Sequence, residues 1–432
     1  MLIFKFCCDK ISIIDLIFGS VKVNSKFKHT TYASYLGYIT QAISINLASL
    51  FFVIFQRNYN ISFSQISLIV TINFIGQMLI DISSTKIIPA LGVRKSVVLA
   101  HVSAAIGLVL LGILPNIMKN AYAAILIATI FMSIGGGLTE VLISPIIDSI
   151  PGEEKSMRMS LLHSFYSWGY VIVIIGTTLF FKSFGQKNWA YISIIWAIVP
   201  ILNSFYFGFV PLPKSIEEEE KADLKKLFGA KLFITFMFLM VCSGAAEQAM
   251  SQWASLFAEE GLGVSKEVGD ILGPCMFALL MGLSRVIYAV FGSKINLKNA
   301  LTLSSALCVL SYLLTVFSKN AIVSLIACAF CGMTVGLMWP GLLSLSSQYN
   351  SEGGSAMFAF LALAGDVGCT LGPLFVGSVS DFAKTFYNGK NFLISASGAS
   401  EFALKLGMLA AIVFPAAMVI RLLFLKKSDK TE

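Results

Sequence analysis

Residues 121–150 read AYAAILIATIFMSIGGGLTEVLISPIIDSI, a run in which only Glu140 and Asp148 carry a charge. An α-helix rises about 1.5 Å per residue, so a run of this length can cross the roughly 30 Å of hydrocarbon in a bilayer. Comparable apolar runs lie at about 31–56, 63–88, 95–116, 159–182, 188–210, 231–258, 268–292, 299–318, 320–347, 355–380 and 402–425. The sequence therefore predicts an all-α membrane protein with about twelve transmembrane helices.

The composition supports the same class. The 432 residues are 57% hydrophobic and 12% charged, with a mean hydropathy of +0.83, which no soluble globular core can bury. The net charge of +8 reports loop orientation and not a nucleic-acid partner. About 21 Lys and Arg residues fall on the side of both termini and about 9 on the other side. We expect both termini on the cytoplasmic side of a bacterial cytoplasmic (inner) membrane.

The chain divides into two similar halves. The long charged connector PLPKSIEEEEKADLKKLFGA occupies residues 211–230. Leu47–Phe51 matches Trp253–Phe257, and Gly76 matches Gly282 at the same offset. A six-plus-six duplication of this kind is a transporter architecture. The expected parts are a cytoplasmic N-terminal segment 1–30, a six-helix bundle 31–210, the connector 211–230, a second six-helix bundle 231–425 and a cytoplasmic tail 426–432.

Ionisable side chains inside the predicted spans are the first functional candidates, because a charge at the bilayer centre is expensive. They are Asp81, Glu140, His163, Glu247, Arg285 and Asp366. Glu140 and His163 flank one turn at comparable depths on neighbouring helices, so they could meet and share a proton. A structural hydrogen-bonded pair is the alternative. Glu247 is the other midspan carboxylate. For Arg285 and Asp366 the alternatives are a charge pair and a place in a cytoplasmic gate.

Amides and aromatic rings gather in the same depth range. They suit a neutral polyhydroxylated ligand, which needs many hydrogen bonds and an apolar platform. The candidate solute-binding residues are Gln41, Asn46, Glu140, His163, Tyr166, Trp168, Gln248, Gln252, Trp253 and Trp339. The alternative is that the amides hold helices together and the aromatic rings pack as core.

Missing motifs exclude other classes. The sequence contains no Walker A loop, no H-E-x-x-H and no G-x-S-x-G, and the connector is too short for a catalytic unit. An enzyme or ATP-driven pump is therefore excluded, and we expect no cofactor and no metal. Arg285 is nearly alone as a midspan cation, which disfavours a dianionic or phosphorylated solute.

Gly136–Pro145 followed by Leu162–Gly169 resembles the fourth-to-fifth helix signature of the fucose permease branch of the major facilitator superfamily. The resemblance extends over all twelve spans. It implies sugar–proton symport, with Glu140 at the position of the carboxylate that couples protons and recognises sugar. His163 stands where the branch usually has Gln.

The chain departs from that family at two places. Ser49 replaces the first-helix Asp of fucose permeases, so Glu140 with His163, or Glu247, takes over coupling, or the protein is a facilitator or uses another ion. The loop signature between helices two and three survives only as Gly92–Lys95. We therefore assign Asp81, Arg94, Arg285 and Asp366 gating or structural roles.

These observations predict a secondary transporter, a monomer in the lipid bilayer, that moves a small neutral polar solute of the sugar class by alternating access. The solute and protons are its expected partners. One alternative is export of amphipathic compounds, which the many Phe residues favour and the fifth-helix pattern does not. The other is a transport-dead nutrient sensor, which the short tail after Arg421 disfavours.

Overall fold

The computed structural model describes residues 25–151, 155–213, 231–291, 296–349, 354–388 and 396–425. Most of the expected N-terminal segment, residues 214–230 of the connector and the tail 426–432 lie outside the described residues. Within the described parts, twelve helices are long and apolar enough to cross a membrane. The predicted all-α fold with about twelve spans is therefore confirmed.

The helices of the first six spans are α3 (Lys28–Asn46) with α4 (Phe52–Tyr59), α5 (Phe63–Leu91), α6 (Val93–Ile117), α7 (Ala121–Asp148), α8 (Lys155–Phe184), and α9 (Trp189–Trp196) with α10 (Ile198–Phe209). The helices of the last six spans are α12 (Lys231–Leu256), α13 (Lys266–Asp270) with α14 (Met276–Phe291), α15 (Leu297–Phe317), α16 (Ala321–Tyr349), α17 (Gly354–Asn388), and α18 (Ala396–Ala410) with α19 (Val413–Leu423).

Two spans are interrupted by proline. α9 ends at Trp196, four residues before Pro200, and α18 ends at Ala410, five residues before Pro415. Proline has no N–H and its ring crowds the preceding turn, so the α-helical ladder breaks there. These interruptions explain why the sixth and twelfth spans are each two helices.

The first span breaks without a proline. α3 ends at Asn46, and a 3₁₀ turn (Ala48–Phe51) leads to α4. The Ser49 hydroxyl donates to the Asn46 carbonyl at 2.7 Å, which is a local bond that competes with the helical ladder. The break therefore lies beside Asn46, one of the predicted solute-binding residues.

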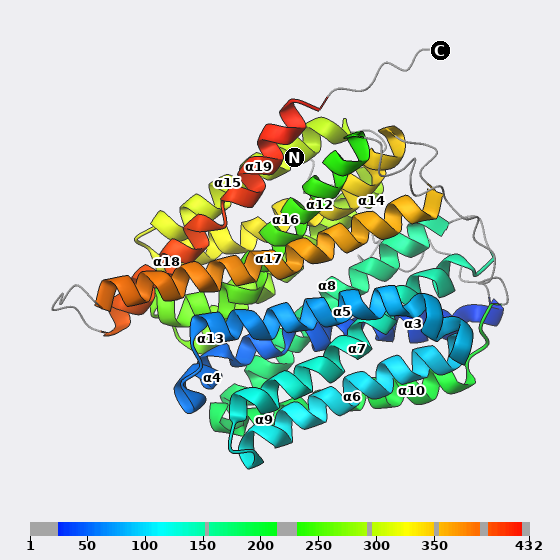
Figure 1. Cartoon of the computed structure of the whole chain (residues 1–432), viewed down its shortest axis with the longest axis horizontal. Coiled ribbons are helices and arrows are strands. Elements are labelled where there is room, and N and C mark those ends of the chain that lie inside the picture. Colours follow the sequence, from blue (N-terminus) through cyan, green and yellow to red (C-terminus); the bar gives the residue numbers. More distant parts are fainter. Residues whose placement is uncertain are drawn as a thin grey trace, which may run out of the picture.

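The helices form two six-helix bundles, with most of α3–α10 below and α12 and α14–α19 above in Figure 1. Their contacts follow one pattern: α3 packs against α7 and α8, as α12 packs against α16 and α17. The bundles meet along two pairs of helices, α5 with α17 and α8 with α14.

The closest helix crossing in the second bundle uses the glycines of α17. A Cβ at Gly368 would lie 2.0 Å from the Val241 carbonyl oxygen, and one at Gly372 would lie 2.3 Å from that of Ala245. Any side chain there would push α17 away from α12. Gly368 and Gly372 thus allow these two helices to pack closely together.

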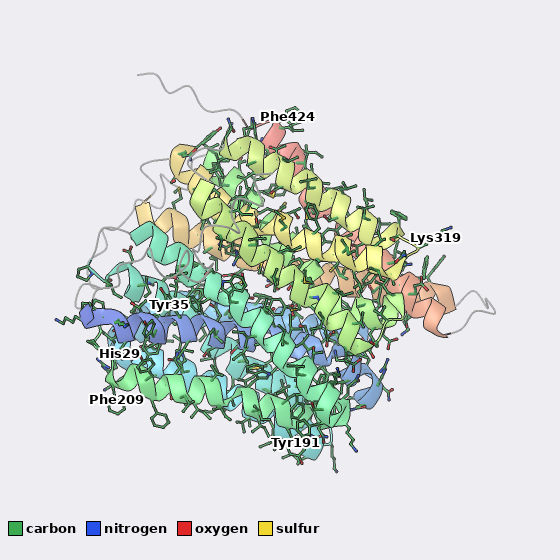
Figure 2. The ribbon with its side chains drawn as sticks, turned by 180° about the vertical axis from the view of Figure 1, so that it is seen from behind. His29, Tyr35, Tyr191, Phe209, Lys319 and Phe424 are labelled. Carbon is green, nitrogen blue, oxygen red and sulfur yellow. The ribbon has the colours of Figure 1, made fainter. Side chains whose placement is uncertain are left out.

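The bundles are tied together at one end of the molecule. We name the end where α10 and α19 finish the connector end, and the end with α4 and α13 the opposite end; Figure 2 shows His29 and Phe209 at the former and Lys319 at the latter. At the opposite end, Arg57 of α4 lies 2.8 Å from both Glu259 and Glu260. Asp381 of α17 accepts from the first backbone N–H groups of α5, where a carboxylate is favourable.

Candidate functional site

A chain of polar side chains crosses between the bundles at mid-depth. Asn46 of α3 donates to the Tyr166 hydroxyl at 3.0 Å and accepts from Gln252 of α12 at 3.2 Å. Gln252 also donates to Gln248 at 3.1 Å, and Gln248 donates to Glu247 at 3.4 Å. We call these five residues the central network. It joins amides of the first helix of each bundle, and these amides are among the candidate solute-binding residues.

Glu140 of α7 has a neutral partner. The Gln41 amide nitrogen donates to Glu140 Oε2 at 2.9 Å. Gln41 is 5% exposed and its Oε1 has no hydrogen-bond partner in the described part of the chain, whereas Glu140 is half-buried. A carboxyl group in this setting can take up or release a proton without leaving a cation unpaired.

His163 does not pair with Glu140 as we had expected. No hydrogen bond joins these two described residues; instead the His163 ring packs edge-on against Tyr38, with centroids 5.1 Å apart. The Tyr38 hydroxyl is bonded to Ser144 at 2.8 Å. His163 is exposed, and a midspan imidazole facing lipid would be costly. We infer that it faces water-accessible space between the bundles.

Arg285 pairs with Glu247, and not with Asp366. Its guanidinium lies 3.7 Å from Glu247 Oε2 and donates to Ser167 Oγ of α8 at 3.4 Å. A glycine allows this approach, because a Cβ at Gly282 would lie 3.2 Å from that of Ser167. The possible Arg285–Asp366 pair is thus wrong for this structure, because no ion pair joins these two described residues.

The tryptophans divide into two groups. Trp253 is fully buried, donates to the Pro373 carbonyl at 3.2 Å and packs against Phe52 and Phe63. In this conformation Trp253 packs between the two bundles, and it has no exposed surface with which to contact a solute. Trp168 and Trp339 are half-buried, and both remain candidates for stacking on a ring.

The residues assigned to gating lie in different surroundings. Arg94 donates to the carbonyls of Phe207 and Gly208 at 2.8 Å, which ties α6 to the end of α10 within one bundle. Asp81 of α5 has a buried oxygen that no described residue bonds, and Asp366 is 6% exposed. Arg94 therefore makes a structural contact, whereas the two aspartates lie on α5 and α17, two helices that pack together between the bundles.

Sequence reasoning missed Tyr38, Ser167 and the charged contacts at the opposite end. Hydroxyl groups carry no midspan cost that would single them out. The contact of Arg57 with Glu259 and Glu260 could have been predicted. Arg57 follows the segment Leu47–Phe51, and the two glutamates follow the matching segment Trp253–Phe257, so the charges at equivalent helix ends are opposite. Repeat-related helix ends with opposite charges indicate a contact between the bundles.

Comparison with known proteins gives a family and a fold. The sequence model of the Major Facilitator Superfamily matches residues 34–373. A search of curated proteins found no similar sequence. Among solved structures, a D-xylose-proton symporter is 14% identical, with a TM-score of 0.76 over 94% of this chain and 100% of that one. The E. coli fucose:proton symporter is 16% identical, with a TM-score of 0.63 over 92% and 99%. A bacterial homolog of the human lysosomal transporter Spinster, inward-facing and occupied, is 14% identical, with a TM-score of 0.73 over 93% and 97%.

Proposed function

The chain belongs to the major facilitator superfamily of secondary transporters, and we propose that it moves a small, neutral, polar solute of the sugar class together with protons. The central network supports the solute class, because its amides and hydroxyl can both donate and accept. The fourth-to-fifth helix signature around Glu140 supports a place beside the fucose permeases. We expect a monomer in a bacterial cytoplasmic membrane.

The observation that carries proton coupling is the bond between Gln41 and Glu140. Glu140 is half-buried at mid-depth, and its direct partner is an uncharged amide. Protonating this carboxyl group removes a charge from the membrane interior, which lowers the cost of moving it between the two sides. Glu247 lacks this freedom, because protonating it would leave Arg285 without a counter-charge.

Alternating access follows from where the bundles touch. The contacts of Arg57 and Asp381 hold the bundles together at the opposite end. We propose that the connector end faces the cytoplasm, in agreement with its Lys and Arg, and that this conformation is inward-facing. Outward opening would then break the ion pairs of Arg57 and release the Asp381 cap from α5.

Transport in vesicles tests the proposal. Purified protein in proteoliposomes is given a panel of radiolabelled sugars, including L-fucose, D-xylose and D-galactose, with and without an imposed pH gradient. We expect at least one sugar to accumulate only with the gradient. Glu140→Gln should lose gradient-driven accumulation by about tenfold or more and keep sugar exchange, because exchange needs no net proton movement. Full accumulation by Glu140→Gln would contradict the coupling, and uptake of amphipathic dyes in place of sugars would contradict the solute class.

A further inference from the structure

Glu247 and Arg285 lie opposite each other, but each has a hydrogen-bonding atom that the other does not bond. Their closest oxygen and nitrogen are 3.7 Å apart, which is beyond hydrogen-bond distance. Glu247 Oε2 and Arg285 Nε are both buried and have no hydrogen-bond partner among the described residues. The remaining bonds, from Gln248 to Glu247 and from Arg285 to Ser167, are both long at 3.4 Å.

Such a pair is unusual at this depth. The side chains are only 8% and 15% exposed, and a buried ion pair repays its desolvation only when its remaining donors and acceptors are bonded as well. A guanidinium has five N–H donors and a carboxylate accepts at both oxygens. Buried groups left open in this way indicate a third partner that is bound during function.

The pair lies close to an exposed side chain of the first bundle. Arg285 contacts Ser167, and the exposed His163 lies one turn earlier on the same face of α8. The pair therefore borders the water-accessible space between α8 and α14, and not the lipid.

The open atoms define the chemistry of that partner. Glu247 Oε2 needs a donor and Arg285 Nε needs an acceptor. A hydroxyl group supplies both, and two adjacent hydroxyl groups can bond both side chains while the pair stays neutral. A carboxylate ligand would be repelled by Glu247, and an ammonium ligand by Arg285.

We propose that Glu247 and Arg285 form a diol-binding subsite of the second bundle, which recognises two adjacent hydroxyl groups of the solute. This inference rests on the proposed function, because it requires a polyhydroxylated solute. It gives Glu247 the role of a binding residue, while Glu140 carries the proton. The subsite determines which sugar is accepted, because a missing hydroxyl group leaves a buried charged side chain unbonded.

Exchange of a labelled sugar in proteoliposomes tests the subsite. Each single-deoxy analogue of the transported sugar competes with the label, first in the wild-type protein. We expect two analogues, lacking neighbouring hydroxyl groups, to bind about 10- to 100-fold more weakly than the parent sugar. Arg285→Lys and Glu247→Gln should weaken the parent sugar by a similar factor but change the affinity for those two analogues by less than about threefold.

Two further variants keep the result interpretable. Glu247→Asp keeps the charge opposite Arg285, so it replaces Glu247→Gln in the competition experiment if Glu247→Gln does not fold. Tyr312→Phe is the matched control, because the Tyr312 hydroxyl is buried and donates to the Ala246 carbonyl, next to Glu247, at 2.8 Å. It should disturb α12 without changing the ranking of the analogues.

The possible failures are distinct. Equal weakening of every analogue by the Glu247 and Arg285 variants, or no weakening at all, would show a purely structural pair and overturn the subsite alone. A wild-type protein that exchanges no neutral sugar would overturn the proposed function and the subsite with it.

Discussion

Each bundle has a carboxyl group near the middle of a span, and the side chain beside it differs between the two bundles. In the first bundle, Glu140 of α7 accepts from the Gln41 amide of α3 at 2.9 Å. In the second bundle, Glu247 of α12 lies 3.7 Å from the Arg285 guanidinium of α14. Gln41 and Glu247 correspond at the 206-residue offset that matches Leu47 with Trp253. The repeat therefore puts an amide at one of two equivalent positions and a carboxylate at the other.

This difference separates two tasks that a symporter must combine. A carboxyl group beside an amide can change its protonation state cheaply, whereas one beside an arginine is needed as a counter-charge. The amides of the central network, Asn46 and Gln252, also correspond at this offset and bond to each other at 3.2 Å. The shared positions join the bundles, and the positions that differ supply the proton site and the ion pair.

The largest expected effect separates the two carboxyl groups by stability. Glu247→Gln leaves Arg285 buried without a counter-charge, so we expect a loss of about 3–5 kcal/mol in the free energy of unfolding. Glu140→Gln should lose less than about 1 kcal/mol, because an amide can still bond to Gln41. Thermal unfolding in detergent, followed by tryptophan fluorescence, measures both. Combining Glu247→Gln with Arg285→Gln should recover part of the loss. Equal losses in Glu247→Gln and Glu140→Gln would mean that the two carboxyl groups do not differ in this way.

A smaller effect concerns the bond between Gln41 and Glu140. Gln41→Leu leaves Glu140 Oε2 without its donor, which should cost about 1–3 kcal/mol of stability. In Glu140→Leu the same substitution should cost much less, since no carboxylate remains to be bonded. A double-mutant cycle on unfolding midpoints gives the coupling energy. Additive costs would mean that Gln41 stabilises α3 and not Glu140.

Depth along the helices was predictable from the sequence, and the direction of the side chains was not. The apolar run lengths located all twelve spans, and the cost of buried charge singled out Glu140, Glu247 and Arg285. The partner of Arg285 was not predictable, because α12 and α17 both carry a carboxylate at mid-depth. Helices that are apolar on nearly every face have no amphipathic pattern to show which way a residue points.

The same limit explains the mistaken pairing of Glu140 with His163. Their equal distances from one turn indicate equal depth, but two helices bring residues together only when the faces also agree. His163 lies against Tyr38, and the Glu140 carboxyl group is bonded to Gln41. Both partners are on α3, which packs against α7 and α8 at once. That α3 lies between α7 and α8, which are consecutive in the sequence, is a tertiary feature, and the spacing of residues along the chain does not reveal it.

A weaker link joins the equivalent amides Asn46 and Gln252. Asn46→Ala and Gln252→Ala should show a coupling energy of about 0.5–1.5 kcal/mol in the free energy of unfolding. Because both amides belong to the central network that we propose binds the solute, each variant should also slow sugar exchange. A double-mutant cycle with exchange rates measured in proteoliposomes checks both expectations. No coupling in either measurement would mean that the repeat-related amides meet without joining the bundles.

The smallest expected effect tests whether Arg285 depends on the second bundle alone. Ser167→Ala removes a hydroxyl group that accepts from Arg285 at 3.4 Å across the interface, a bond too long to contribute much. Stability should change by less than about 0.5 kcal/mol and sugar exchange by less than about threefold. Ser144→Ala, which removes the partner of Tyr38 on α7, is the matched control in the first bundle. A larger loss in Ser167→Ala than in this control would mean that α8 of the first bundle holds Arg285 in place. The ion pair would then belong to both bundles, and opening of the interface between α8 and α14 would weaken it during transport.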